Sequence, residues 1–132
     1  MENKFDILTT ELRSLLGDRC STGDSIIDLH SRDAAYTPPV KPHAVVFPEN
    51  TEEVSSIVKL CSEKNCPIVA FGVGSSLEGQ VVPVVGGVSV DFSRMNKITA
   101  VQTEDLIATV EPGVTRIQLN EYLRDQGLIF TV

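Results

Sequence analysis

Aromatic side chains and positive charge are both scarce in this chain of 132 residues. It has no tryptophan, 5% aromatic residues and a formal net charge of -7. A surface that binds nucleic acid needs a basic patch with aromatic side chains on which bases can stack. The composition therefore argues against nucleic acids and other polyanions as partners.

Long apolar runs and paired cysteines are lacking as well, and histidine is scarce. No apolar stretch approaches the roughly 18 residues that a membrane span needs, so we expect a compact soluble chain without a transmembrane segment. The three cysteines are an odd number without zinc-type pairing, and no signal peptide is seen, which predicts a cytoplasmic setting. The two histidines, His30 and His43, lie in different loops. We expect no metal site and interpret both as structural or surface residues.

What is present predicts one α/β domain. Hydrophobic residues make up 42% of the chain, and its length is that of a single domain with a core. Apolar residues at helical spacing predict a helix over residues 5–16, with Gly17 as its left-handed stop. Residues 23–42 are interpreted as a long connecting arm, since the prolines near its end exclude regular structure there. We therefore divide the chain into residues 1–43, helix and arm, and residues 44–132, the sheet region.

The middle of the chain reads as strand, helix and strand. Residues 44–47 form a short apolar strand, and Asn50 and Glu53 have the spacing of a helix capping box. Pro67 ends that helix, and residues 68–71 form the second strand. The pattern predicts a βαβ unit with parallel pairing. The apolar face of the helix is expected to consist of Val54, Ile57, Val58 and Cys61, which makes Cys61 a core residue, with redox or metal roles as minor alternatives.

Three strand-like runs follow, at residues 87–92, 97–102 and 106–110, and their short polar turns suggest increasingly antiparallel pairing. Thr115 precedes Gln118 at capping-box spacing and starts another helix, for which Gly127 is the expected end. A last apolar strand is expected over residues 128–132, cut off at what looks like an artificial boundary.

The segment most informative about function is the glycine-rich loop, residues 71–80, which follows the second strand. Its glycines and serines allow successive backbone N–H groups to converge on one anion, and a pyrophosphate is the natural ligand. A glycine-rich turn that binds nothing is the competing interpretation. We also expect the preceding strand to be buried and parallel.

Two common phosphate loops fit less well. A Walker loop fails because no Gly-Lys-Ser/Thr ending is present. A Rossmann loop is closer, since Gly72 and Gly74 have its first spacing and Asp91 lies at a distance suited to a ribose contact, but Leu77 stands at the third glycine position. The glycines and proline of residues 79–87 leave no room for the crossover helix, so Asp91 is interpreted as a turn residue at a strand end.

Several ordered motifs resemble FAD-linked oxidases and dehydrogenases with the vanillyl-alcohol-oxidase (PCMH) type of FAD-binding domain, in particular the branch of D-lactate dehydrogenase and the glycolate oxidase D subunit. The matching strings are PIVAFGVGSSLEG at residues 67–79, GGVSVDFSRMN at 86–96, VEPGVT at 110–115 and LNEYLR at 119–124. The resemblance runs from about His30 to Val132. It implies an α/β (α+β) fold: a small parallel βαβ subdomain, then the start of a mixed or antiparallel sheet with flanking helices.

The resemblance also implies a cofactor and its site. FAD would lie with its pyrophosphate along residues 71–76, namely Phe71, Gly72, Val73, Gly74, Ser75 and Ser76, with Gly79 and Gln80 nearby. Some relatives bind FAD covalently through a histidine where Ser75 stands, so non-covalent FAD is implied here. Close relatives often carry histidine at Gln80, which leaves the contact of Gln80 open.

Three functions follow as hypotheses. The first is an N-terminal, truncated part of an FAD domain from an enzyme that oxidises a D-2-hydroxy acid such as D-lactate or glycolate. Such a part holds no catalytic residues, binds FAD weakly or not at all by itself, and self-associates through its truncated edge. The second is a nicotinamide-binding domain built on Gly72, Gly74 and Asp91. The third is a non-catalytic scaffold for a protein partner.

Overall fold

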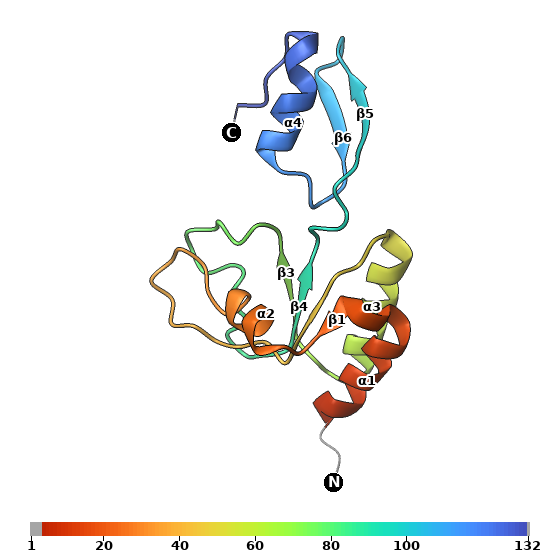
Figure 1. The fold of residues 1–132 in the computed structure, drawn as a ribbon, viewed down its shortest axis with the longest axis vertical. Helices are drawn as coiled ribbons and strands as arrows, with labels where there is room; N and C mark the ends of the chain where they lie inside the picture. Colours follow the sequence, from red (N-terminus) through yellow and green to blue (C-terminus); the bar gives the residue numbers. More distant parts are fainter. Residues whose placement is uncertain (1–3, 132) are drawn as a thin grey trace.

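The computed structural model describes residues 4–131, which form two lobes (Figure 1). The first lobe holds a four-stranded sheet with helices, and the second holds a two-stranded hairpin with one helix. In chain order the elements are α1 (Lys4–Leu16), the 3-10 turn η1 (Gly17–Arg19), β1 (Cys20–Ser21), α2 (Asp24–Leu29), β2 (Ala44–Val46), α3 (Thr51–Glu63), β3 (Ile68–Phe71), β4 (Val88–Asp91), β5 (Ile98–Gln102), β6 (Ile107–Val110), α4 (Arg116–Leu123) and the 3-10 turn η2 (Arg124–Gln126).

The larger sheet has the strand order β1-β2-β4-β3. β2 and β3 are parallel, as expected, but each pairs with β4, which lies between them, so the prediction of a directly paired βαβ unit was wrong. β4 is the first of the three strands for which increasingly antiparallel pairing was predicted. It is instead parallel to both of its neighbours. The reason is burial: every residue of β4 is buried, whereas β3 is largely accessible along its length. The strand that can be covered on both faces takes the centre of a parallel sheet.

Two helices cover one face of this sheet. Leu8, Leu12 and Leu16 of α1 and Ile57 and Cys61 of α3 are buried in one core cluster, together with alternate residues of β2 and β4. Cys61 is therefore a core residue, and burial raises its pKa to about 12 with a further contribution from nearby Cys66. Val58, expected on the apolar face of α3, is 46% exposed, because the helix contacts the core along a narrower stripe.

The opposite face is covered by the arm, residues 23–42. The sequence reading missed the short strand β1 and the six-residue helix α2. β1 pairs antiparallel with β2, so chain on both sides of the division at residues 43 and 44 belongs to one sheet. Alternate residues of β4 point to this face, among them Asp91, which bonds the side chain of His30 directly after α2.

The second lobe follows the sequence pattern more closely. β5 and β6 pair antiparallel, and the Thr115 hydroxyl caps α4 by accepting a hydrogen bond from the Gln118 amide. Gly127 ends the following turn in the left-handed conformation. The predicted last strand is wrong for residues 128–131, which are irregular and held by the Asn120 side chain through both backbone groups of Phe130. Val132 lies outside the described residues.

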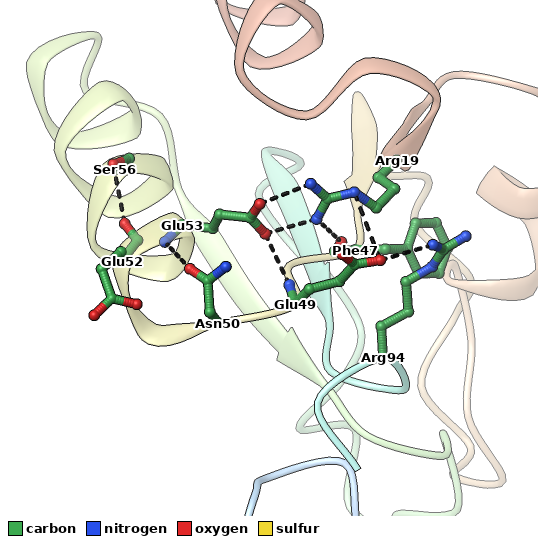
Figure 2. Close-up of polar contacts among 8 residues, drawn as sticks. All are labelled: Arg19, Phe47, Glu49, Asn50, Glu52, Glu53, Ser56 and Arg94. Carbon is green, nitrogen blue, oxygen red and sulfur yellow. Dashed lines mark hydrogen bonds and ion pairs between the residues drawn. The ribbon is translucent and has the colours of Figure 1, made fainter. Parts of the chain in front are cut away.

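A charged network fastens the start of the sheet to α3 (Figure 2). The Arg19 guanidinium makes two hydrogen bonds to the Glu53 carboxylate, of 2.6 and 2.7 Å, and a third to the carbonyl of Phe47. Asn50 caps α3 as predicted by accepting from the Glu53 amide. The return bond of the capping box differs, because the Glu53 carboxylate accepts from the Glu49 amide one residue earlier. The Glu53 side chain thus joins a helix N-terminus to a distant arginine.

Candidate functional site

The glycine-rich loop leaves the carboxyl end of β3, beside the carboxyl end of β4. Phe71, the last residue of β3, is in register with Asp91, the last of β4, and the Phe92 amide donates to the Phe71 carbonyl. In open sheets with parallel strands, ligands bind outside these carboxyl ends. The connection from the loop to β4 contains turns and no helix, which agrees with the exclusion of a Rossmann crossover. β3 itself is an edge strand here, so the expectation of a buried strand was wrong for most of its residues.

One glycine in the loop is required by its backbone. Gly74 has φ +68°, and a Cβ atom added there would lie 2.7 Å from the Phe71 ring. Gly72 is different, because its φ is ordinary and a Cβ would meet no atom within 4 Å. Neither sterics nor backbone conformation within the protein requires glycine at this position. Such a glycine is typical of a backbone that a ligand approaches closely.

Most backbone amides of the glycine-rich loop have no backbone hydrogen-bond acceptor among the described residues. Within residues 4–131, none of the amides of residues 72–78 donates to a backbone carbonyl, and none belongs to a helix or strand. Successive amides without a backbone acceptor at a glycine turn can form an anion-binding nest. Of the predicted site residues, Phe71 is buried, Gly74, Ser76 and Gly79 are half-buried, and Gly72, Val73, Ser75 and Gln80 are exposed.

A buried polar pair lies beneath the loop. The Nε2 atom of His30 is 2.8 Å from the Asp91 carboxylate, and Nδ1 donates to the Ile26 carbonyl at 2.8 Å. Burial alone raises the pKa of Asp91, but hydrogen bonds from His30 and Ser93 outweigh it and hold that pKa below its usual range. The His30 ring also packs on the Phe71 ring, with centroids 4.1 Å apart. Asp91 is thus a strand-end turn residue, as predicted, and His30 is structural and buried.

Sequence reasoning missed a carboxylate that contacts the loop. Asp33, in the arm, accepts hydrogen bonds from the Ser76 hydroxyl at 2.7 Å and from the Gly79 amide at 3.0 Å. These bonds, together with one from the Ala35 amide, hold the pKa of Asp33 below its usual value although burial opposes them. Two of the predicted cofactor-binding groups are therefore already engaged by the protein. The local signal was only that of a turn, since Asp33 bonds the amide two residues ahead.

Other kinds of site receive no support from the part of the chain that the structure describes. No group of three or more His, Cys, Asp and Glu side chains there could hold a metal ion. Nor is any described helix both long enough and apolar enough to span a membrane. A groove of about 510 Å³ lies in the second lobe, lined by β5, β6, α4 and the residues after it, and shares no residue with the glycine-rich loop.

The match to known proteins centres on flavoproteins. Residues 42–132 match the family described as the FAD binding domain. The chain is 42% identical over 126 residues to a probable mitochondrial D-lactate dehydrogenase of Danio rerio, covering 95% of this chain and 25% of that protein. It is 38% identical over 102 residues to the glycolate oxidase subunit GlcD of Bacillus subtilis, covering 77% of this chain and 22% of that protein.

Solved structures agree with this match. p-Cresol methylhydroxylase with bound substrate superposes with a TM-score of 0.85 at 29% identity, covering 97% of this chain and 26% of that one. An alkyldihydroxyacetonephosphate synthase superposes with a TM-score of 0.81 at 26% identity, covering 92% of this chain and 25% of that one. The expected α/β fold of the PCMH type is confirmed.

The same matches bear on three other points. The chain spans about a quarter of the length of the curated relatives it matches. The mitochondrial names of several relatives give no support to the predicted cytoplasmic setting. The nicotinamide-binding and scaffold hypotheses find no support among the matches either. The relatives that it matches include D-lactate dehydrogenases and a glycolate oxidase subunit. The chain belongs to the FAD binding domain family, and its cofactor is FAD.

Proposed function

We propose that this chain supplies the pyrophosphate-binding part of the FAD site in an oxidoreductase that acts on a D-2-hydroxy acid such as D-lactate or glycolate. The observation that carries the proposal is the glycine-rich loop at the carboxyl end of β3, where Gly74 has positive φ and the amides of residues 72–75 have no backbone partner among the described residues. The substrate class comes from the names of its relatives, D-lactate dehydrogenases and a glycolate oxidase subunit.

The proposed cofactor-binding residues are Phe71, Gly72, Val73, Gly74, Ser75, Ser76, Gly79 and Gln80. Within this set the roles differ. The amides of residues 72–75 are the proposed donors to the pyrophosphate, and Phe71 is the proposed floor beneath Gly74. The Ser76 hydroxyl and the Gly79 amide bond Asp33, so their proposed role is to hold the shape of the loop.

FAD, when bound, supplies the acceptor for the hydride of the hydroxy acid. This chain's part is to bind and orient the cofactor. Ser75 offers a hydroxyl with no capacity for the covalent link that a histidine could form, so we propose non-covalent FAD. Because the chain spans about a quarter of its relatives' length, the catalytic residues are proposed to lie in the remainder of such enzymes.

The cellular compartment is proposed only to be a reducing one. Cys20, Cys61 and Cys66 are all buried free thiols. Burial raises the pKa of each of the three, which keeps them as unreactive core residues.

The test is a thermal-shift titration of the chain with FAD and, separately, with NADH. A ligand that binds only the folded state raises the melting temperature with concentration. We expect FAD to raise it and NADH to leave it unchanged. The site is a single accessible loop, so the chain should purify without flavin colour and bind FAD weakly. A shift with NADH but not with FAD would overturn the proposal.

A further inference from the structure

The arm does more than connect α2 to β2. The Val40 amide donates to the Ser31 carbonyl at 2.9 Å, which closes residues 31–40 into a loop of their own. This closed part of the arm contacts the glycine-rich loop at Gly79, where an added Cβ atom would lie 2.7 Å from the Thr37 hydroxyl oxygen. The two loops are far apart in the chain and touch only through tertiary structure.

The strongest contact between them is the Asp33 carboxylate. One of its oxygens, Oδ1, accepts from the Ala35 amide at 2.8 Å and so fixes the turn of its own loop. The other, Oδ2, accepts from the Ser76 hydroxyl and the Gly79 amide. Each oxygen therefore has a separate task, and only a carboxylate has two acceptor oxygens to do both.

We propose that Asp33 is a positioning residue for FAD: its carboxylate latches the far end of the glycine-rich loop to the arm, so that the amides of residues 72–75 are held in place for the pyrophosphate. The inference rests on the proposed function for the identity of the ligand. The latch itself, Asp33 with Ser76 and Gly79, is a statement about the protein alone.

The placement of the bonds distinguishes a latch from a competitor for the anion site. A carboxylate that stood in for the pyrophosphate would bond the amides that the ligand uses. Asp33 accepts from Ala35, Ser76 and Gly79, and from none of residues 72–75. Its charge is already met by three donors, so it can remain in place when a second anion binds.

A second contact of the arm supports the same role. His30 packs on Phe71 while bonded to Asp91, and Phe71 lies directly under Gly74. The arm thus touches the loop at its start through His30 and at its end through Asp33. Both residues precede residue 42, where the match to the FAD binding domain begins, so this support comes from outside the matched region.

The experiment compares amide hydrogen exchange in the chain and in Asp33→Ala, Asp33→Asn and a control, Asp28→Asn. Asp28 lies in the same arm and pairs with Lys41, away from the loop, so the control makes the same charge change. In Asp33→Ala we expect the Gly79 amide to exchange about tenfold faster, the effect of losing a charge-assisted hydrogen bond. Asp33→Asn should satisfy Ala35 or the loop but not both, and should fall between. Amides of α1 and α3 should be unchanged.

FAD titration of the same variants tests the functional half. We expect Asp33→Ala to weaken FAD binding about tenfold by the same loss, and Asp28→Asn to leave it at the wild-type value. If Asp33→Ala does not fold, Ser76→Ala on the accessible loop removes one donor and should also speed exchange at Gly79.

The outcomes separate the two claims. Unchanged exchange at Gly79 in folded Asp33→Ala overturns the latch, whatever FAD does. Faster exchange with unchanged FAD affinity overturns the positioning role. A wild-type chain that shows the latch by exchange but never responds to FAD contradicts the proposed function instead.

Discussion

Gly72 and Gly74 lie two residues apart in the same loop, but the reasons for a glycine at the two positions differ. Gly74 must be glycine for the fold, because its φ is positive and the Phe71 ring leaves no space for a Cβ atom. Gly72 has no such reason within the protein. The sequence pattern treats the two alike, whereas the structure gives a backbone reason for Gly74 alone, and contact with the ligand is the role we propose for Gly72.

Substitution separates these two causes. Gly74→Val should sharply reduce FAD binding, since a β-branched residue resists positive φ and would displace Phe71.

Gly72→Ala should fold with an unchanged melting temperature and still lower FAD affinity, as the added methyl group meets only the ligand. Ser75→Ala should cost about 1 kcal/mol of binding free energy, the contribution of one neutral hydroxyl. The measurements are melting temperature and FAD titration. Equal FAD affinity in wild type and Gly74→Val would contradict the assignment of this loop as the pyrophosphate-binding site.

Residue-scale predictions from sequence succeed where the partner is local. The caps Asn50 and Thr115 and the stop Gly127 each act within three or four residues, so spacing alone predicts them. Asp33 and His30 act on partners 43 or more positions away, at Ser76 and Asp91. No local pattern carries that information, so the sequence places Asp33 only in a connecting arm and His30 only among structural or surface residues.

At the scale of elements, the order of strands was the main error. The strand, helix, strand pattern of residues 44–71 fits a paired βαβ unit, and local spacing cannot tell that a later strand enters between the two. What marks β4 as the central strand is burial in the folded chain, where Val88, Ser89 and Val90 are all covered. The hairpin β5–β6 was easier to predict because its strands are joined by a short turn.

The elements at the start of the chain are held to α3 by Arg19 and Glu53, and this link predicts a pH dependence. The hydrogen bonds from Arg19, with a further bond from the Glu49 amide, lower the pKa of Glu53 from 4.5 to about 2 despite burial. A carboxylate with a lowered folded pKa stabilises the fold fully above its unfolded pKa, and that contribution is lost as pH falls through the folded pKa. The window is therefore pH 4.5 down to about 2.

Glu53→Gln should lower the free energy of unfolding at neutral pH by about 1.5–3 kcal/mol, the range for hydrogen bonds to charged groups. The same variant should lose less stability than wild type between pH 4.5 and 2. Urea unfolding across that range measures both effects. The matched control is Glu52→Gln in the same first turn of α3, whose side chain has no ion pair among the described residues. An identical pH slope in Glu53→Gln and wild type would contradict the assignment.

At the scale of the whole molecule the two lobes differ in how well they are covered. The sheet of the first lobe has helices on one face and the arm on the other. In the second lobe every residue of β6 is exposed, and only Leu119 and Leu123 of α4 are buried. A two-stranded hairpin has little stability unless it packs against something else. The apolar groove between the hairpin and α4 is thus poorly covered by the described residues.

We therefore expect the chain to self-associate through this groove, which residues 128–130 help to line, and not by strand pairing at the expected last strand, residues 128–132. Ile107 and Ile129 line the groove with 51% and 72% of their surfaces exposed, and exposed apolar patches of this kind favour contact with another chain. Light scattering after size exclusion should show a dimer that dissociates on dilution. Ile107→Lys should shift the chain to monomer, because a charge would be buried in the contact. Leu29→Lys, which adds the same charge at an equally accessible leucine of the first lobe, should leave the dimer intact. A wild-type chain that stays monomeric at every concentration, or a dimer that Leu29→Lys breaks and Ile107→Lys does not, would show that another surface, or none, mediates association.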